Sequence, residues 1–144
     1  MQTHIEELLE DKGALVHTIE LNTTVWDAVQ IMNDCRIGSL VVVDDSRPVG
    51  MFTERDILTR VIAACREPAT TRVFEVMTQD LVSISGHDTV EDAMRRVTLT
   101  RCRHLPVIED GCLAGLISIG DLTRWMIREQ KHEIANLMDY ITAR

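Results

Sequence analysis

The segment Gly50-Met51-Phe52-Thr53-Glu54-Arg55-Asp56 decides the fold, because it returns 65 positions later as Gly115-Leu116-Ile117-Ser118-Ile119-Gly120-Asp121. Both copies read glycine, two apolar residues, a hydroxyl residue, two variable residues and aspartate. The repetition continues upstream without a gap from about residue 19, and its matched pairs include Thr24-Val25 with Thr89-Val90, Asp27-Ala28 with Asp92-Ala93, and Leu40 with Leu105. An internal repeat of this length marks one supersecondary unit. We therefore expect two similar halves with a cleft between them.

The composition supports a folded core and argues against some classes of partner. The chain has 144 residues, of which 45% are hydrophobic and 3% aromatic, so the core is expected to be aliphatic. This length allows one ordinary domain or two small halves. The formal net charge is −8, which argues against nucleic acid and against an anionic membrane surface, because both attract basic proteins.

The chain shows no sign of secretion or of metal binding. Its first residues are acidic and polar and lack the pattern of a signal peptide, and no apolar run approaches the roughly 20 residues of a membrane helix. The cysteines form no Cys-x-x-Cys pair, so reduced thiols in the cytoplasm are expected. The histidines show no paired ligand spacing, so no metal site is expected. No nucleophile-elbow context supports a Ser-His-Asp combination, so no catalytic centre is expected either. The cysteines and histidines are Cys35, Cys65, Cys102, Cys112, His4, His17, His87, His104 and His132.

Hydrophobic periodicity and turn residues predict the elements of the first copy. Residues 1–13 are expected to form a lead-in helix closed by Gly13. Thr23-Thr24 offers a cap for a helix over 25–35. The other expected elements are a strand at 14–20, a buried strand at 39–44, a turn at 45–48, a returning strand at 49–53 and a helix at 56–65.

The second copy is expected to repeat this order after a linker at 67–72. Its predicted elements are strands at 81–85, 104–109 and 113–117, a helix at 89–99 and a helix from Asp121. The chain is thus expected to be an α/β (α+β) protein with two β-α-β-β-α units, at 14–66 and 73–128, related by pseudo-twofold symmetry. Residues 129–144 extend the last helix and carry an apolar stripe, which needs a cover from the module itself, a dimer mate or another protein.

The chain resembles a pair of cystathionine-β-synthase (CBS) domains, also called a Bateman module. The resemblance covers about residues 12–128 and rests on the two Gly-x-x-(Thr/Ser)-x-x-Asp motifs, the run 103–108 with its partner 38–43, and Val76-Met77-Thr78. It is similar to stand-alone CBS-pair proteins and implies a regulatory module, not an enzyme. The implied module binds an adenine nucleotide between the repeats, couples occupancy to conformation or to an unidentified target protein, and forms a homodimer.

The resemblance also implies binding residues, carried over by position. Asp121 would hold ribose hydroxyls and Ser118 a phosphate, with Arg103 and His104 near the phosphates. The opposing wall would come from Lys12, Val16, His17, Ile37, Gly38 and Ser39. A second possible site would use Thr53, Asp56, Val82 and Cys102. Because Gly38-Ser39 is small and uncharged, the cleft at Asp121 is the one expected to take the adenine.

The residue types of the motif suit this chemistry without the resemblance. An aspartate can accept hydrogen bonds from both hydroxyls of a ribose, and a helix N-terminus attracts a phosphate through its unpaired N–H groups and dipole. The alternative is that Thr53 and Ser118 only cap the helices that follow them. The presence of the motif in both copies favours binding.

The ligand and two other classes of function stay open. AMP is the first expectation, with ADP, ATP, NAD or an S-adenosyl compound as alternatives, and no cofactor is required. The protein could instead be a ligand-free interaction module. It could also be a redox-responsive thiol protein using Cys102 or Cys35, because the cation Arg103 would activate a neighbouring thiol.

Overall fold

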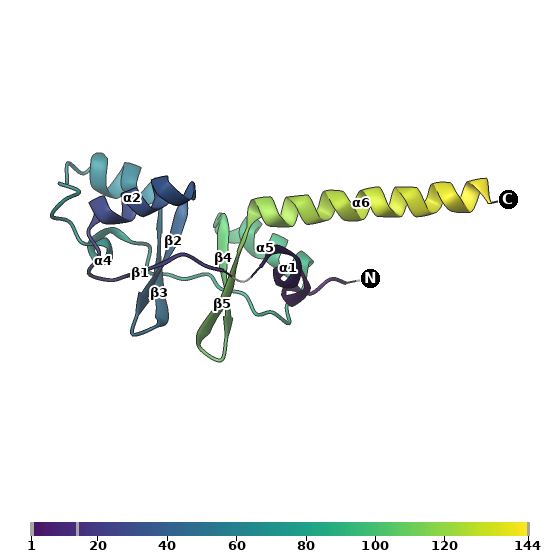
Figure 1. The fold of residues 1–144 in the computed structure, drawn as a ribbon, viewed down its shortest axis with the longest axis horizontal. Coiled ribbons are helices and arrows are strands. Elements are labelled where there is room, and N and C mark those ends of the chain that lie inside the picture. Colours follow the sequence, from purple (N-terminus) through teal and green to yellow (C-terminus); the bar gives the residue numbers. More distant parts are fainter. Residues whose placement is uncertain (1, 14, 144) are drawn as a thin grey trace.

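The computed structural model describes residues 2–13 and 15–143, and its two halves each carry one copy of the repeat (Figure 1). The first half holds a sheet with the order β1 (Thr18–Glu20), β2 (Ser39–Asp44), β3 (Arg47–Thr53), in which β1 is parallel and β3 antiparallel to β2. The second half holds the antiparallel hairpin of β4 (His104–Glu109) and β5 (Cys112–Ser118). The predicted tandem repeat in a mixed α and β protein is confirmed.

The long helices of the two copies begin and end in the same way. α2 (Val25–Cys35) and α5 (Val90–Thr100) are capped by the hydroxyl groups of Thr24 and Thr89, which accept backbone N–H bonds of the first turn. Each helix ends at an arginine in the left-handed region, namely Arg36 and Arg101. The helix predicted over 25–35 is confirmed, and the one predicted over 89–99 lies one residue further along.

The N-terminal segment completes the second half of the molecule. The carbonyl oxygen of Thr3 accepts a hydrogen bond from the N–H of Val90 at 2.9 Å, and the N–H of Ile5 donates to the carbonyl of Asp88 at 2.9 Å. α1 (Ile5–Lys12) follows directly. It begins later than the helix predicted over 1–13, because residues 2–4 are not helical, but it is closed by Gly13 as predicted. Its buried side chains belong to one cluster with residues of β4, β5 and the helix that follows β5: Ile5, Leu8, Leu9, Leu105, Val107, Ile117 and Leu122.

The segment between the copies completes the first half in the same way. The carbonyl oxygen of Thr71 accepts from the N–H of Val25 at 2.9 Å, and the N–H of Val73 donates to the carbonyl of Thr23 at 2.8 Å. The short helix α4 (Val73–Val76), which the sequence did not predict, then joins the first core. The segment before the first copy thus completes the second half, and the segment before the second copy completes the first half. We call this arrangement the exchange of segments.

Close packing of these segments explains the glycine that opens each repeated motif. A Cβ atom at Gly115 would lie 2.6 Å from a methyl carbon of Leu9, and one at Gly50 would lie 2.7 Å from the sulfur of Met77. Both distances are far below ordinary carbon contacts. α1 therefore packs directly on the backbone of the hairpin β4–β5, and the segment that carries Met77 packs directly on the backbone of the hairpin β2–β3.

The prediction of a strand over 81–85 is wrong. In this range only Ile84 forms a β-bridge, which pairs it in parallel with Val107 of β4. In the first copy the N–H of Val41 donates to the carbonyl of His17 at 3.3 Å. Pro106 takes the equivalent place in the second copy and has no N–H to donate, so the parallel ladder cannot extend.

Several predicted boundaries also shift. The strand predicted over 14–20 begins at Thr18, and Ala14 lies outside the described residues. The tight turn needs only residues 45 and 46, so the returning strand starts at Arg47. The helix predicted over 56–65 begins two residues earlier, as α3 (Glu54–Asp56), and continues as a π-helix, η1 (Ile57–Ile62), while the last helix, α6 (Ile119–Thr142), begins before Asp121. Both begin early because the hydroxyl residue, not the aspartate, caps them.

α6 projects well beyond the rest of the molecule (Figure 1). Every residue from 130 to 143 is exposed. Across the described ranges 2–13 and 15–143, no helix is both long enough and apolar enough to span a membrane.

We predict that Ile5→Ala lowers the free energy of unfolding by about 2–4 kcal/mol, because the substitution leaves a cavity in the core of the second half. Ile5 is fully buried there. The matched control is Leu15→Ala, because Leu15 is 85% exposed. Urea denaturation of both variants measures the difference. Equal, small effects would show that α1 does not belong to the core.

Candidate functional site

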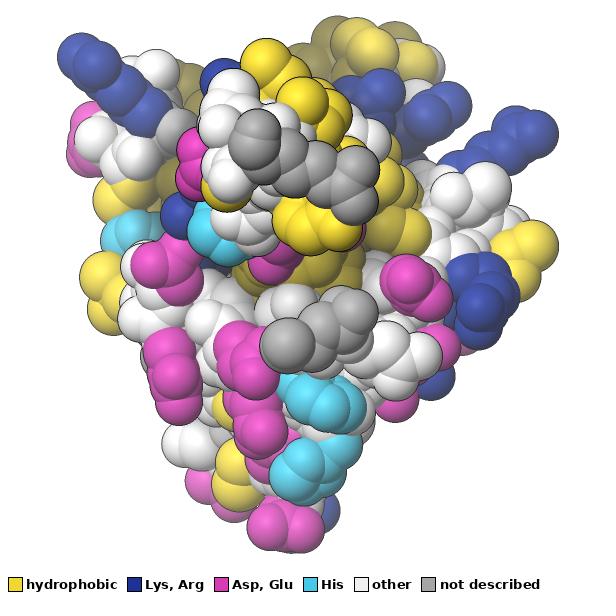
Figure 2. Space-filling model, turned by 90° about the vertical axis from the view of Figure 1, so that its right-hand side faces the viewer, with side chains coloured by type: hydrophobic (Ala, Val, Ile, Leu, Met, Phe, Trp, Pro, Cys, Tyr) yellow, Lys and Arg dark blue, Asp and Glu magenta, His cyan; other side chains and the backbone are white. Residues whose placement is uncertain are grey.

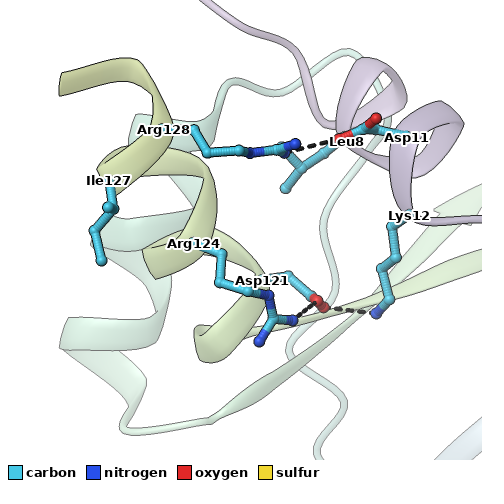
Figure 3. Close-up of a pocket in the computed structure, with 7 residues that line it drawn as sticks. All are labelled: Leu8, Asp11, Lys12, Asp121, Arg124, Ile127 and Arg128. Atoms are coloured by element: carbon cyan, nitrogen blue, oxygen red, sulfur yellow. Dashed lines mark hydrogen bonds and ion pairs between the residues drawn. The ribbon is translucent and has the colours of Figure 1, made fainter. Parts of the chain in front are cut away.

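Asp121 lies at the start of α6, where its carboxylate receives four hydrogen bonds. Figure 3 shows the two that come from Lys12 and Arg124. Lys12 Nζ donates to Oδ2 at 2.6 Å, and the backbone N–H and hydroxyl of Ser118 donate to the same oxygen at 2.8 and 2.9 Å. Arg124 Nη2 donates to Oδ1 at 2.6 Å. The carboxylate therefore holds two cations and, with the N-cap residue Ser118, completes the capping box of α6.

The surroundings of Asp121 stabilise its ionised form. Burial by itself raises the pKa of Asp121, but the hydrogen bonds from Lys12 and Ser118 outweigh this effect and leave the pKa below its ordinary value. Lys12 also donates to the carbonyl oxygen of Leu116 in β5 at 2.6 Å. The end of α1 is thus tied to both the strand and the helix of the second motif.

Asp56 occupies the equivalent place in the first copy but has different partners. The backbone N–H of Thr53 donates to its Oδ2 at 3.0 Å, and the hydroxyl of Thr78 donates to Oδ1 at 3.1 Å. Arg60 Nε lies 3.8 Å from Oδ1. The neutral hydroxyl of Thr78 is thus the partner of Asp56, whereas the charged ammonium group of Lys12 is the equivalent partner of Asp121.

The hydroxyl residues of both motifs cap helices. Thr53 Oγ1 accepts from the N–H of Asp56, and Ser118 Oγ accepts from the N–H of Asp121. The capping role that we considered as the alternative is therefore present in both copies. In this role each hydroxyl oxygen accepts a backbone hydrogen bond. Capping does not test nucleotide binding, which stays a prediction.

The starts of the two hairpins lie close together in space. The backbone N–H of Glu54 bonds to the carbonyl of Gly38, and a Cβ at Gly38 would lie 3.2 Å from the carboxyl carbon of Glu54. Glu54, from the first copy, acts on the pKa of His104, from the second. Glu54 therefore lies beside Gly38 and close enough to His104 for its charge to act on the imidazole.

His104 is half-buried at the first position of β4, opposite Ser118 in the hairpin register. Burial is the largest cause that lowers the pKa of His104, and the positive charges of Lys12 and Arg103 lower it further. Asp121 and Glu54 act in the opposite direction but do not prevail. The imidazole is therefore neutral at pH 7, and the exposed Arg103 is the permanent cation at this end of β4.

A cavity of about 420 Å³ opens between α1 and α6 beside Asp121 (Figure 3). Its volume lies within the range of about 300–1,000 Å³ that is typical of small-ligand sites. Charged side chains from both helices line it, and Arg128 bonds to Asp11 across it at 2.7 Å. The lining residues are Leu8, Asp11, Lys12, Asp121, Arg124, Ile127 and Arg128.

The other predicted residues lie in several environments. Val16 packs in the apolar contact between the two halves, and Ile37 packs against the first core. Ser39 is buried at the start of β2. Val82 and Cys102 are partly buried against the second core.

The thiols form no disulfide among the described residues, and Cys35 Sγ lies 3.9 Å from Nδ1 of the exposed His17. Within ranges 2–13 and 15–143, no three side chains of His, Cys, Asp or Glu converge in a way that could hold a metal ion.

Two cations and one carboxylate at this site were not predicted from the sequence, namely Arg124, Arg128 and Asp11. Arg124 follows Asp121 by three residues, a spacing that places two helical side chains on one face. This spacing could have revealed Arg124 as a partner of Asp121 from the sequence alone. Arg128 and Asp11 lie 117 positions apart, so no local pattern could have paired them.

Comparisons with known proteins agree with the geometry of the fold. The sequence model of the CBS domain matches residues 15–63 and 73–128. The CBS domain-containing protein CBSX3, mitochondrial, of Arabidopsis thaliana is 34% identical over 148 residues, which cover 96% of this chain and 72% of that protein.

Solved structures share the same arrangement. A protein with CBS domains from Burkholderia ambifaria MC40-6 superposes with a TM-score of 0.84 at 37% identity, over 89% of this chain and 96% of that chain. A hexameric CBS-CP12 protein from bloom-forming cyanobacteria superposes with a TM-score of 0.75 at 34% identity, over 85% of this chain and 71% of that chain.

We predict that His104→Gln weakens the dependence of stability on pH below about 6.5, the ordinary pKa of histidine. The folded protein takes up this proton less readily than the unfolded chain, so stability is full above that pH and falls as the pH drops towards the lowered pKa. Urea denaturation at pH 7.5, 6.5 and 5.5 compares the unmodified chain, His104→Gln and the exposed control His132→Gln. Three parallel profiles would contradict the prediction.

Proposed function

Since this chain belongs to the CBS-domain family, we propose that it is a regulatory module which binds an adenine nucleotide beside Asp121. Binding of the nucleotide changes the packing of the module or its affinity for a target protein. AMP is the first ligand to test, followed by ADP, ATP, NAD and S-adenosyl compounds, and no further cofactor is needed. We propose no catalytic role, and the cytoplasm is the proposed location.

The distribution of charge carries this proposal. The chain has a net charge of −8, yet the cavity beside Asp121 is lined by three cations and two carboxylates, a balance of +1. The exposed guanidinium of Arg103 lies at the neighbouring start of β4. Guanidinium groups bind phosphate through two parallel hydrogen bonds. A local excess of positive charge in an acidic protein suits an anionic ligand.

The contact between Lys12 and Asp121 supplies a route from binding to conformation. Ribose hydroxyls that donate to Asp121 would compete with the ammonium group that now bonds there at 2.6 Å. Lys12 is the last residue of α1, and a phosphate offers it a replacement partner. Nucleotide binding is therefore expected to shift the end of α1, because a ligand favours the conformation that binds it better.

Self-association is part of the proposal. The CBS-CP12 relative is hexameric, and a twofold pair is the commonest assembly of identical chains. We propose a homodimer for this chain.

We predict that Asp121→Ala weakens AMP binding about ten- to a hundredfold, while Asp56→Ala has a smaller effect. The lost hydrogen bonds to a charged group correspond to about 1.5–3 kcal/mol. Calorimetric titration of AMP into the unmodified chain and both variants measures this, after thermal unfolding has shown that each variant is folded. If no ligand of the proposed set binds the unmodified chain, the proposal fails. Equal losses in the two variants would refute the assignment to Asp121.

We predict that Arg103→Ala weakens binding of AMP but hardly changes binding of adenosine, because Arg103 is proposed to contact the phosphate. Arg103→Lys should restore part of the affinity, since lysine keeps the charge but not the forked geometry. Titration of each variant with both ligands separates the two cases. A parallel loss for AMP and adenosine would assign Arg103 to the support of the fold.

A further inference from the structure

The C-terminal part of α6 exposes apolar side chains that the described chain does not cover. Ile134, Leu137 and Ile141 are between 61% and 64% exposed. Viewed from the C-terminal end of α6, hydrophobic side chains gather on one side of the projecting helix (Figure 2). A bare helix of this length is marginal in water, so this part of α6 needs a packing partner.

These apolar side chains follow a seven-residue repeat. Ile127, Ile134 and Ile141 are spaced by seven, and Gln130 and Leu137 follow the first two of them by three positions. This is the a and d pattern by which two helices interlock in a coiled coil. We define the seam as Ile127, Gln130, Ile134, Leu137 and Ile141.

The seam points away from the body of the molecule. Trp125 packs against the second core, and Ile134 follows it by nine residues, which is about 180° around an α-helix. Figure 3 shows the same separation closer to the body, where Arg128 reaches towards α1 and Ile127 points away from it. Ile127, the first residue of the seam, also borders the cavity beside Asp121. Beyond it the body of the described chain does not cover the seam, because every residue from 130 to 143 is exposed. The cover there must come from a second molecule.

We propose that the cover is the seam of a second copy of this chain, in a parallel two-stranded coiled coil. Isoleucine at the a positions with leucine at d favours two parallel strands. In an in-register pair Gln130 faces its own counterpart, whereas a register shifted by one heptad would place its amide against Leu137. The proposal goes beyond the proposed function because it names the surface of self-association, and it does not depend on nucleotide binding.

The residues that flank the seam are compatible with this pairing. Only one of them is basic and one acidic, so two copies meet no row of like charges. The flanking residues are Met126, Lys131, Glu133, Met138 and Tyr140. The seam from Ile127 to Ile141 is about 21 Å long at 1.5 Å per residue.

The first test is the mass of the full chain in solution, measured by light scattering. Ile134→Glu is expected to halve the mass measured for the unmodified chain at the same concentration, because it places two like charges in the seam. Asn136→Glu, which adds the same charge at an exposed position outside the seam, is the matched control and should keep the full mass. A monomeric unmodified chain, or an unchanged mass for Ile134→Glu, overturns the proposal.

The second test reports the orientation of the two helices and remains valid if Ile134→Glu fails to fold. In a chain whose four cysteines are replaced by serine, Ile141→Cys is expected to form a disulfide between copies under mild oxidation. Asn136→Cys in the same background should not. Absence of the Ile141→Cys cross-link in an associated chain overturns the parallel pairing. AMP titration of Ile134→Glu should match the unmodified chain, so failure of this proposal is distinct from failure of nucleotide binding.

Discussion

The fold depends on the exchange of the two segments that precede the repeats. Backbone hydrogen bonds join Thr3 and Ile5 to the loop before α5, and equivalent bonds join residues 71 and 73 to the loop before α2. The apolar side chains that follow complete the opposite core in each case. Each half is therefore completed by a segment that lies outside its own copy of the motif. The same exchange brings the end of α1 to Asp121, so the chemistry of the candidate site is a consequence of how the fold is completed.

Two copies of one motif end in different surroundings for the same reason. Asp56 and Asp121 occupy equivalent positions, and each forms a capping box with the hydroxyl residue three places before it. The segment that packs on the first copy brings a threonine hydroxyl to Asp56, whereas α1 brings an ammonium group to Asp121. The repeat thus supplies two similar scaffolds, and the exchanged segments make them chemically distinct.

The features that sequence reasoning predicted are those set by local pattern. The hairpins, α2 and α5 follow from periodicity and from caps within a few residues of each element. The packing of α1 on the second copy joins residues more than 80 positions apart, and the periodicity of α1 shows only that one face is buried. The strand predicted over 81–85 had suitable residues, but its partner strand carries Pro106 where a donor was needed. In the candidate site, Ser118 and Asp121 could be predicted because they belong to the repeated motif. The place of Lys12 depended on the resemblance, and the pairing of Arg128 with Asp11 required three-dimensional contacts.

The exchange of segments also imposes an order on folding during synthesis. The first half has all of its core residues once position 77 has left the ribosome, because its completing segment follows it directly. Ile5, Leu8 and Leu9 are made before both copies of the motif, yet their partners in β5 and α6 extend to Leu122. These side chains therefore stay uncovered while more than a hundred further residues are added. Since domains fold as units while the chain grows, the first copy is complete before the N-terminal helix has a core to join.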